Sequence, residues 1–117
     1  MQELRNKIMS YYDYVDTKDF ENLFSLFSDS IIYSRSRDRL ISGIDELKRF
    51  YLLTRGLGTG THRIMSIFDF ENTVIVKGAF EGKFKDGNIA NFVFVDFFEF
   101  SDGKIIRRST YTDIADV

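Results

Sequence analysis

The hydrophobic pattern of this chain changes from a helical spacing to an alternation near residue 61. Alternation places successive side chains on opposite faces of a strand, whereas residues three or four apart share one face of a helix. From residue 73 to residue 85, one face carries Val74, Val76, Gly78, Phe80, Gly82 and Phe84. Glycine-containing turn sequences interrupt the alternation at residues 86–88 and 101–103. The second half of the chain is therefore predicted to form four long antiparallel strands, at about residues 61–70, 73–85, 89–100 and 104–115.

The first half of the chain contains three segments with apolar residues at helical spacing. The first helix is predicted to bury a stripe made of Leu4, Ile8, Tyr11, Tyr12 and Val15. Polar residues 16–19 end it, and a second short helix follows with Phe20, Leu23, Phe24 and Phe27. The third helix begins at Ser42 or Gly43, buries Ile44, Leu47, Phe50, Tyr51 and Leu52, and ends at residues 56–60. Between the second and third helices we predict a short strand at residues 31–33 and a polar connection at residues 34–40.

Helices followed by a run of hairpins are typical of an α+β fold, in which helices cover one face of a curved sheet. The length of 117 residues suits one domain, and no linker, internal repeat or low-complexity segment divides the sequence. We therefore predict a single domain over residues 1–117. A cone-shaped cavity between the helices and the sheet is the expected place for a ligand.

Charge and composition exclude several classes of partner. The 16 basic and 18 acidic residues are interspersed, so no basic face is available for a nucleic acid. Cysteine is absent, which excludes disulfides and thiolate metal sites. The charged N-terminus does not resemble a signal peptide, and no apolar run approaches the roughly 20 residues that span a bilayer. We expect a cytoplasmic protein that binds neither nucleic acid nor a membrane.

Asp96 is the strongest chemical clue in the sequence. Strand alternation over residues 91–101 places it on one face with Phe92, Phe94, Phe98 and Phe100. A buried carboxylate must find a hydrogen-bonding partner, retain its proton, or border a cavity that admits water or a ligand. The alternative interpretation is a structural aspartate that a neighbouring hydroxyl or backbone amide satisfies.

The order of these elements resembles the nuclear-transport-factor-2-like (NTF2-like) fold, and particularly its SnoaL-like branch of polyketide cyclases and small acid–base enzymes. The resemblance rests on residues 14–30, residues 42–51, His62 and residues 94–106. It covers nearly the whole chain, although no single segment is diagnostic. It implies a cystatin-like architecture, in which N-terminal helices pack on a strongly curved, mostly antiparallel sheet and enclose a conical cavity.

The segment Val-Asp-Phe-Phe-Glu-Phe at residues 95–100 looks like the strand of ketosteroid isomerase that carries a protonated oxyanion-hole aspartate. This resemblance implies that Asp96 holds its proton and, with the hydroxyl of Tyr11, donates a hydrogen bond to a substrate oxygen. The chain departs from that enzyme at Ser34, which stands where the isomerase has its general base. Because serine is a poor base at neutral pH, we do not expect steroid isomerisation by that mechanism.

The chain is also similar to scytalone dehydratase and bile-acid dehydratase. These enzymes combine a tyrosine and an aspartate on the first helical segment with a histidine at the start of the long strands. The resemblance places Tyr11, Asp16 and His62 in these roles, with Arg108 on the last strand. His62 would act as the general base, and Asp16 would orient its imidazole and favour the charged form. The alternatives are a structural histidine and an aspartate that only caps a helix.

The pocket wall is expected to be aromatic with one cation, formed by Tyr12, Phe80, Phe92, Phe94, Phe98 and Arg108. We predict no metal, because a lone histidine without clustered carboxylates cannot supply the three protein ligands of catalytic zinc. No cofactor is expected either, since the glycines at residues 56–60 precede a strand rather than a helix. Arg35, Arg37 and Arg39 border the expected cavity mouth, where a solvated polar loop is favoured over an anion site.

Two functions remain open from the sequence. One is a cofactor-independent enzyme of the isomerase, cyclase or dehydratase type that acts on a small hydrophobic carbonyl or alcohol compound. The other is a non-catalytic module of the same fold that binds a hydrophobic ligand or assembles as a dimer. In both cases we expect a homodimer, because Val93, Val95 and Phe97 make the outer face of their strand too apolar for open solvent.

Overall fold

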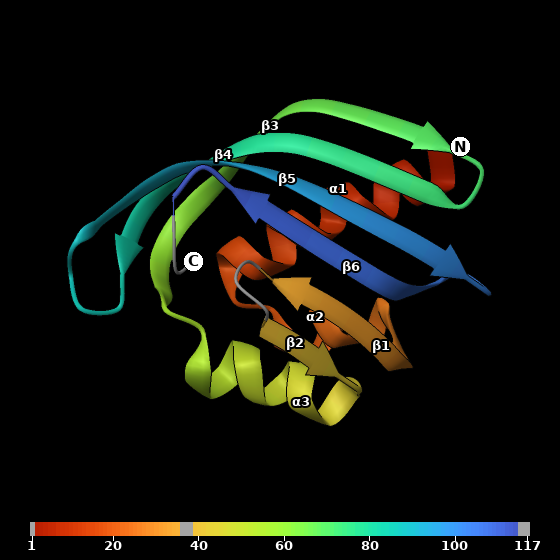
Figure 1. The fold of residues 1–117 in the computed structure, drawn as a ribbon, viewed down its shortest axis with the longest axis horizontal. Helices are drawn as coiled ribbons and strands as arrows, with labels where there is room; N and C mark the ends of the chain where they lie inside the picture. The colour runs from red at the N-terminus through yellow and green to blue at the C-terminus, as the bar shows by residue number, and fades with distance from the viewer. Residues whose placement is uncertain (1, 36–38, 115–117) are drawn as a thin grey trace.

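The computed structural model describes residues 2–35 and 39–114, which form an α+β fold (Figure 1). Its elements are, in chain order, α1 (Gln2–Thr17), α2 (Phe20–Ser25), β1 (Phe27–Arg35), β2 (Arg39–Ser42), α3 (Ile44–Arg49), the π-helical turn η1 (Phe50–Thr54), β3 (Leu57–Phe70), β4 (Thr73–Phe84), β5 (Ile89–Ser101) and β6 (Lys104–Thr112). The predicted order, with helices first and hairpins afterwards, is confirmed.

The described strands form one sheet of six, in the order β2-β1-β6-β5-β4-β3. All neighbouring pairs are antiparallel except β1 and β6, which run parallel. Gly87 and Gly103 occupy the β4–β5 and β5–β6 turns with φ values of 93° and 76°, which a glycine adopts without strain. The four long strands therefore form a continuous meander, and β1 joins it through the last strand.

The core lies between α1 and the inner face of the long strands (Figure 1). The predicted stripe of α1 is buried at Ile8, Tyr11, Tyr12 and Val15. From the sheet, the side chains that meet it and are fully enclosed are Val74, Val76, Phe98 and Ile105. The inner layer is thus apolar on both sides, and the Asp96 side chain is only 1% exposed within it.

Several predictions differ from the structure, and the first is Phe27, predicted on the second helix and found at the start of β1. The segment predicted as a connection contributes Ser34 and Arg35 to β1 and residues 39–40 to β2, while residues 36–38, with Arg37, lie outside the described residues. Strand β3 begins at Leu57 rather than near residue 61. Leu52, predicted to be buried, is 52% exposed. The chain makes a π-helical turn there, closed by the Arg55 N–H donating to the Phe50 carbonyl, so the helical spacing does not continue.

A β-bulge between Ile64 and Ser66 changes the direction of the side chains along β3. Before the bulge, His62 pairs with Phe80 and both side chains face inward. After it, Ile67 pairs with the buried Val76, so the inward parity passes from even to odd residues. Phe68 and Phe70, which alternation from His62 places inward, are instead exposed at 61% and 74%.

Candidate active site

Asp96 on β5 is held by hydrogen bonds from three side chains. Tyr12 on α1 donates its hydroxyl to Oδ2 at 2.5 Å, and Thr110 on β6 donates to Oδ1 at 2.5 Å. Arg108, also on β6, forms an ion pair with Oδ2 at 3.0 Å. Two hydroxyl donors and a guanidinium suit a carboxylate that accepts hydrogen bonds only. This geometry therefore does not support the protonated, hydrogen-bond-donating Asp96 that the sequence led us to expect.

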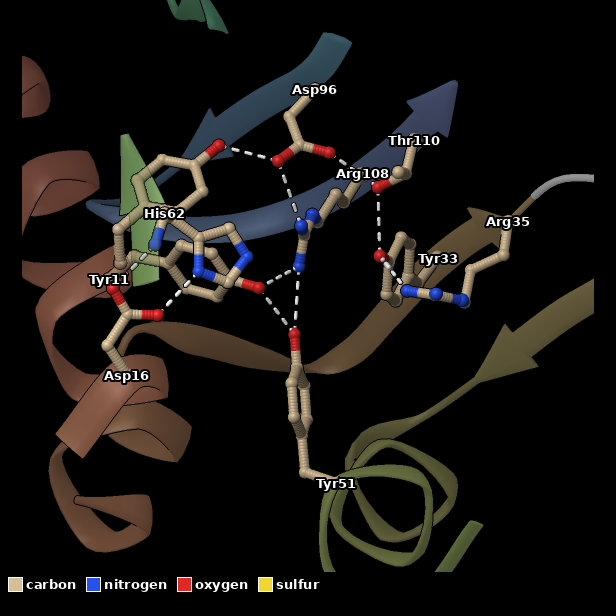
Figure 2. A network of polar contacts seen from close by, with 10 residues as sticks. Tyr11, Asp16, Tyr33, Arg35, Tyr51, His62, Asp96, Arg108 and Thr110 are labelled. Atoms are coloured by element: carbon tan, nitrogen blue, oxygen red, sulfur yellow. Dashed lines mark hydrogen bonds and ion pairs between the residues drawn. The ribbon is translucent and has the colours of Figure 1, made fainter. Parts of the chain in front are cut away.

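Arg108 lies at the centre of the polar network and is 5% exposed (Figure 2). Besides the ion pair, its Nη1 donates to the hydroxyls of Tyr11 and Tyr51, the latter at 2.8 Å. Its guanidinium carbon lies 4.5 Å from the centroids of the Tyr11 and Tyr33 rings. Burial acts to lower the pKa of Arg108, but the negative charge of Asp96 and the neighbouring phenols of Tyr11, Tyr33 and Tyr51 together more than offset this and raise the pKa above its usual range. The side chain is thus a fixed cation.

The hydroxyls of Tyr11 and Tyr51 lie 2.5 Å apart. Both accept a hydrogen bond from Arg108, and one of them must donate to the other. The remaining phenolic hydrogen has no acceptor among the described residues. One phenolic hydrogen of this pair is therefore available for a hydrogen bond to a ligand oxygen. The buried cation Arg108 holds the pair in position.

A second arm of the network runs from Asp96 to Arg35 on β1 (Figure 2). Because Thr110 gives its only hydroxyl hydrogen to Asp96, it must accept the 2.8 Å hydrogen bond that links it to Tyr33. Tyr33 in turn accepts from Arg35 Nη1 at 2.6 Å. Every hydrogen in this arm is directed toward Asp96, which supports its negative charge. Arg35 itself is 8% exposed, so it is not part of a solvated loop.

His62 and Asp16 form a separate pair at the edge of the network (Figure 2). His62 Nδ1 lies 2.5 Å from Asp16 Oδ1, and the backbone N–H of His62 donates to Oδ2 at 2.9 Å. Asp16, near the end of α1, thus binds both the ring and the backbone of the histidine. With Nδ1 as the donor, Nε2 becomes an acceptor, and it has no partner among the described residues. This leaves a basic nitrogen free for a ligand.

Tyr12 connects the two groups. Its hydroxyl binds Asp96, while its ring centroid lies 5.2 Å from that of His62. Phe80 and Phe94 pack against the other sides of the imidazole, at 4.9 and 5.5 Å. The histidine therefore sits in an aromatic cage, with its side chain 7% exposed.

A small cavity of about 20 Å³ lies where the groups meet, with room for about one water molecule. Its wall includes His62, Asp96 and Arg108. Of the predicted aromatic wall, Phe92 and Phe94 line the cavity, whereas Tyr12, Phe80 and Phe98 are buried among the side chains that pack around it. Tyr11 and Asp16 reach the site only through Arg108 and His62.

Sequence reasoning assigned no chemistry to Tyr33, Tyr51 or Thr110. Thr110 carried a usable signal, since alternation on the last strand places it on the same face as Arg108. The helical spacing predicts Tyr51 on the buried side of the third helix, and the structure places it, buried, within the π-helical turn η1. Arg35 and Arg55 also line the cavity, and the parallel pairing of β1 with β6 brings Arg35 there.

The described residues contain no group of three histidine, cysteine, aspartate or glutamate side chains that could hold a metal ion. In the same part of the chain, no helix is long and apolar enough to cross a bilayer. A wider hollow of about 500 Å³ lies apart from the network, against Arg39, Glu46 and Arg49. His62, Asp96 and Arg108 therefore meet at the small cavity and not at this wider hollow.

Tyr11 and Tyr12 are expected to resist alkaline ionisation. Burial raises the pKa of both phenols well above the usual 10.0, and the nearby Asp96 carboxylate raises that of Tyr12 further. Since an unfolded chain ionises these groups near pH 10, the stability that they contribute is complete below that pH and is lost as the pH rises above it. Urea denaturation at increasing pH, with tyrosinate absorbance of the folded protein, checks this. An identical alkaline decline in wild type and Tyr12→Phe would contradict it.

Comparison with known proteins identifies the domain family that this chain matches. The SnoaL-like domain family matches residues 8–108. No curated protein sequence matches the chain significantly. Several solved structures have the same fold, among them NTF2-like proteins of unknown function.

Three of these structures carry functional descriptions. A candidate SnoaL-like polyketide cyclase from Jannaschia sp. CCS1 is 14% identical, with a TM-score of 0.84 over 96% of this chain and 86% of that one. A candidate ketosteroid isomerase from Kribbella flavida DSM 17836 is 18% identical, with a TM-score of 0.82 over 100% and 82%. An LEH-like epoxide hydrolase from M. tuberculosis is 17% identical, with a TM-score of 0.85 over 99% and 86%. At these identities the similarity establishes the fold alone, which is the NTF2-like fold.

Proposed function

Because the chain belongs to the SnoaL-like domain family, we propose that it is a cofactor-independent acid–base enzyme acting on a hydrophobic carbonyl or alcohol substrate. The fold does not select the reaction, since structures that share it are described as a cyclase, an isomerase and a hydrolase. The observation that carries the proposal is the His62–Asp16 pair, whose free Nε2 belongs to a residue that lines one cavity with Asp96 and Arg108.

In this proposal, His62 is the general base. Nε2 removes a proton from a carbon or hydroxyl group of the substrate, and the Asp16 carboxylate stabilises the imidazolium that forms. Negative charge then develops on the substrate oxygen. The fixed positive charge of Arg108, which lines the cavity, stabilises this charge, and the Tyr11–Tyr51 pair holds the guanidinium in position. The imidazolium afterwards returns the proton, either to another carbon in an isomerisation or to a departing hydroxyl in a dehydration.

Two observations favour this assignment over the mechanism of ketosteroid isomerase. Asp96 accepts three hydrogen bonds from side chains, so it is not free to donate one to a substrate. Ser34, at the position of the isomerase base, is exposed on β1 and provides no carboxylate. The base must therefore come from elsewhere, and His62 is the candidate that lines the cavity.

The test is hydrogen exchange on hydrophobic ketones. The protein is incubated in deuterated buffer with a panel of aryl and cyclic ketones, and NMR follows the loss of the α-hydrogen signal. We expect at least one ketone to exchange faster than in buffer that contains an equal amount of denatured protein. Absence of acceleration across ketones, together with no dehydration of the corresponding β-hydroxy ketones, would overturn the proposal.

The small cavity favours a second candidate, a ligand-binding module without catalysis. A volume of about 20 Å³ accommodates a substrate only if side chains move. Binding of a hydrophobic ketone, detected by changes in the NMR signals of His62 and Asp96, without any hydrogen exchange, would support this alternative.

We also propose that the chain forms a homodimer through the outer face of its sheet. Phe68, Phe97 and Tyr111 are 61%, 38% and 60% exposed there, and no described helix covers them. The register places them on one outward side with Ile75 and Val95. Exposed apolar patches of this kind mark association surfaces.

Phe97→Glu is expected to convert the dimer to monomer, because a charge would be buried at the centre of the interface. Analytical ultracentrifugation measures the change. Leu53→Glu is the matched control, since Leu53 is 68% exposed on η1, away from this face. A wild-type protein that sediments as a monomer at all accessible concentrations would contradict the proposal.

A further inference from the structure

We propose that the substrate of this site is an amphipathic carboxylate, whose acid group binds a basic basin at the mouth of the cavity. This inference rests on the proposed function, because it names the substrate class of the same site. The basic basin is a hollow of about 160 Å³ whose wall contains Lys18, Arg55 and Lys85 beside apolar side chains. Lys18 directly follows α1, Arg55 lies between η1 and β3, and Lys85 directly follows β4.

The cations of the basic basin have no ion-pair partner among the described residues. Nε of Arg55 is fully enclosed and makes no hydrogen bond. Its guanidinium carbon lies 5.6 Å from the centroid of the Tyr51 ring, which leaves the polar edge for another group. An enclosed donor without an acceptor is costly, so this arrangement suits a bound anion.

The acidic residues nearest in sequence to these lysines form hydrogen bonds with other partners. Asp16 binds His62, Asp19 accepts from the Asn22 side chain, and Asp86 accepts from Asn88. The wall of the basic basin therefore contains three positive charges and no carboxylate. Within the described structure, nothing neutralises them.

The basic basin adjoins the small cavity, because Arg55 and Leu57 line both. The two walls together contain five cations and one carboxylate outside the His62–Asp16 pair, namely Asp96. Arg35, on the inner side, is 8% exposed and also has an enclosed Nε without a partner. Arg35 is buried without a carboxylate partner among the described residues, Arg55 is half-buried, and Lys18 and Lys85 are exposed at the rim, so an anionic ligand would supply the counter-charge that these groups lack.

The apolar part of the wall indicates the rest of the ligand. Val15, Phe20 and Leu57 surround the cations, so the anionic group should be attached to a hydrophobic skeleton. A planar carboxylate matches the guanidinium of Arg55, and the lysines contribute point charges. A substrate held in this way would place its carbonyl or hydroxyl end toward His62 and Arg108.

Calorimetric titration with naphthoate and its neutral amide, naphthamide, tests the proposal. We expect wild type to bind naphthoate more tightly, and inorganic phosphate to compete poorly because it lacks the apolar skeleton. Lys85→Gln and Arg55→Met should each weaken naphthoate binding about fivefold or more and weaken naphthamide binding by a smaller factor. Lys83→Gln is the matched control, since Lys83 is exposed on the same strand and lies outside the basin wall. Circular dichroism confirms that each variant is folded.

Equal binding of naphthoate and naphthamide, or an equal loss in Lys83→Gln and Lys85→Gln, would overturn the inference. So would competition by phosphate as strong as that by naphthoate, which would indicate a site for free anions. Other outcomes would contradict the proposed catalytic function without contradicting the carboxylate site, or the reverse. Carboxylate binding without hydrogen exchange on keto acids would leave the basin assigned and remove the catalysis. Exchange that is equally fast for neutral ketones and keto acids would support the catalysis and contradict the assignment of the basic basin.

Discussion

Asp96→Asn is expected to lower the free energy of unfolding by about 3–5 kcal/mol. The substitution preserves size but removes the negative charge opposite Arg108, which is 5% exposed and makes its ion pair at 3.0 Å. An uncompensated buried guanidinium is the main cost. The asparagine amide group also brings donors toward Tyr12 and Thr110, which already donate to this position. Urea denaturation followed by circular dichroism measures the change.

Two further variants test whether loss of the buried ion pair causes the loss of stability. Asp29→Asn, on an exposed part of β1, removes a carboxylate without a buried partner and should change stability by less than about 0.5 kcal/mol. The double variant Asp96→Leu with Arg108→Met removes both charges and should recover much of the loss. Equal losses in the single and double variants would show that the ion pair is not the origin of the effect.

His62→Gln is expected to reduce the rate of α-hydrogen exchange by about 10²–10⁴-fold. Glutamine retains a polar side chain that can donate to Asp16, but its amide does not accept a proton at neutral pH. The backbone hydrogen bond from residue 62 to Asp16 is unaffected by the substitution. NMR measurement of exchange on the most reactive ketone of the panel gives the ratio.

Substitutions on α1 provide the control for this second prediction. Asp16→Asn should also lower the exchange rate, because the amide no longer stabilises the imidazolium. Asp13→Asn, one turn earlier on the exposed side of the same helix, should leave the rate unchanged. Retention of more than a tenth of the wild-type rate in His62→Gln would exclude this histidine as the base.

The sequence predicted the fold well because its evidence is periodic. The stripe of α1 and the inward face of β4 each depend on many residues, so one irregularity does not erase the pattern. The bulge in β3 depends on a single additional residue and leaves no periodic signal. For that reason the alternation that correctly turned His62 inward failed at Phe68.

The candidate site was predictable in part. The resemblance that singled out Asp16, His62, Tyr11 and Arg108 selected residues that the structure brings together as two pairs, although their roles remain proposed. The hydrogen-bond partners of Asp96 could not be predicted, because they lie on α1 and β6. The burial of Arg35 could not be predicted either, since it depends on β1 pairing with a strand more than 70 residues away.

That parallel pair also has a consequence for the order in which the chain folds. The strands of the β3–β6 meander have partners next to them in sequence, whereas β1 must close a loop that contains nearly the whole meander before it meets β6. Closing a longer loop has a larger entropic cost, and contacts of high sequence separation slow folding. Tyr33 comes from β1, while Arg108 and Thr110 come from β6. The polar network should therefore be completed only when the most distant contacts of the topology form.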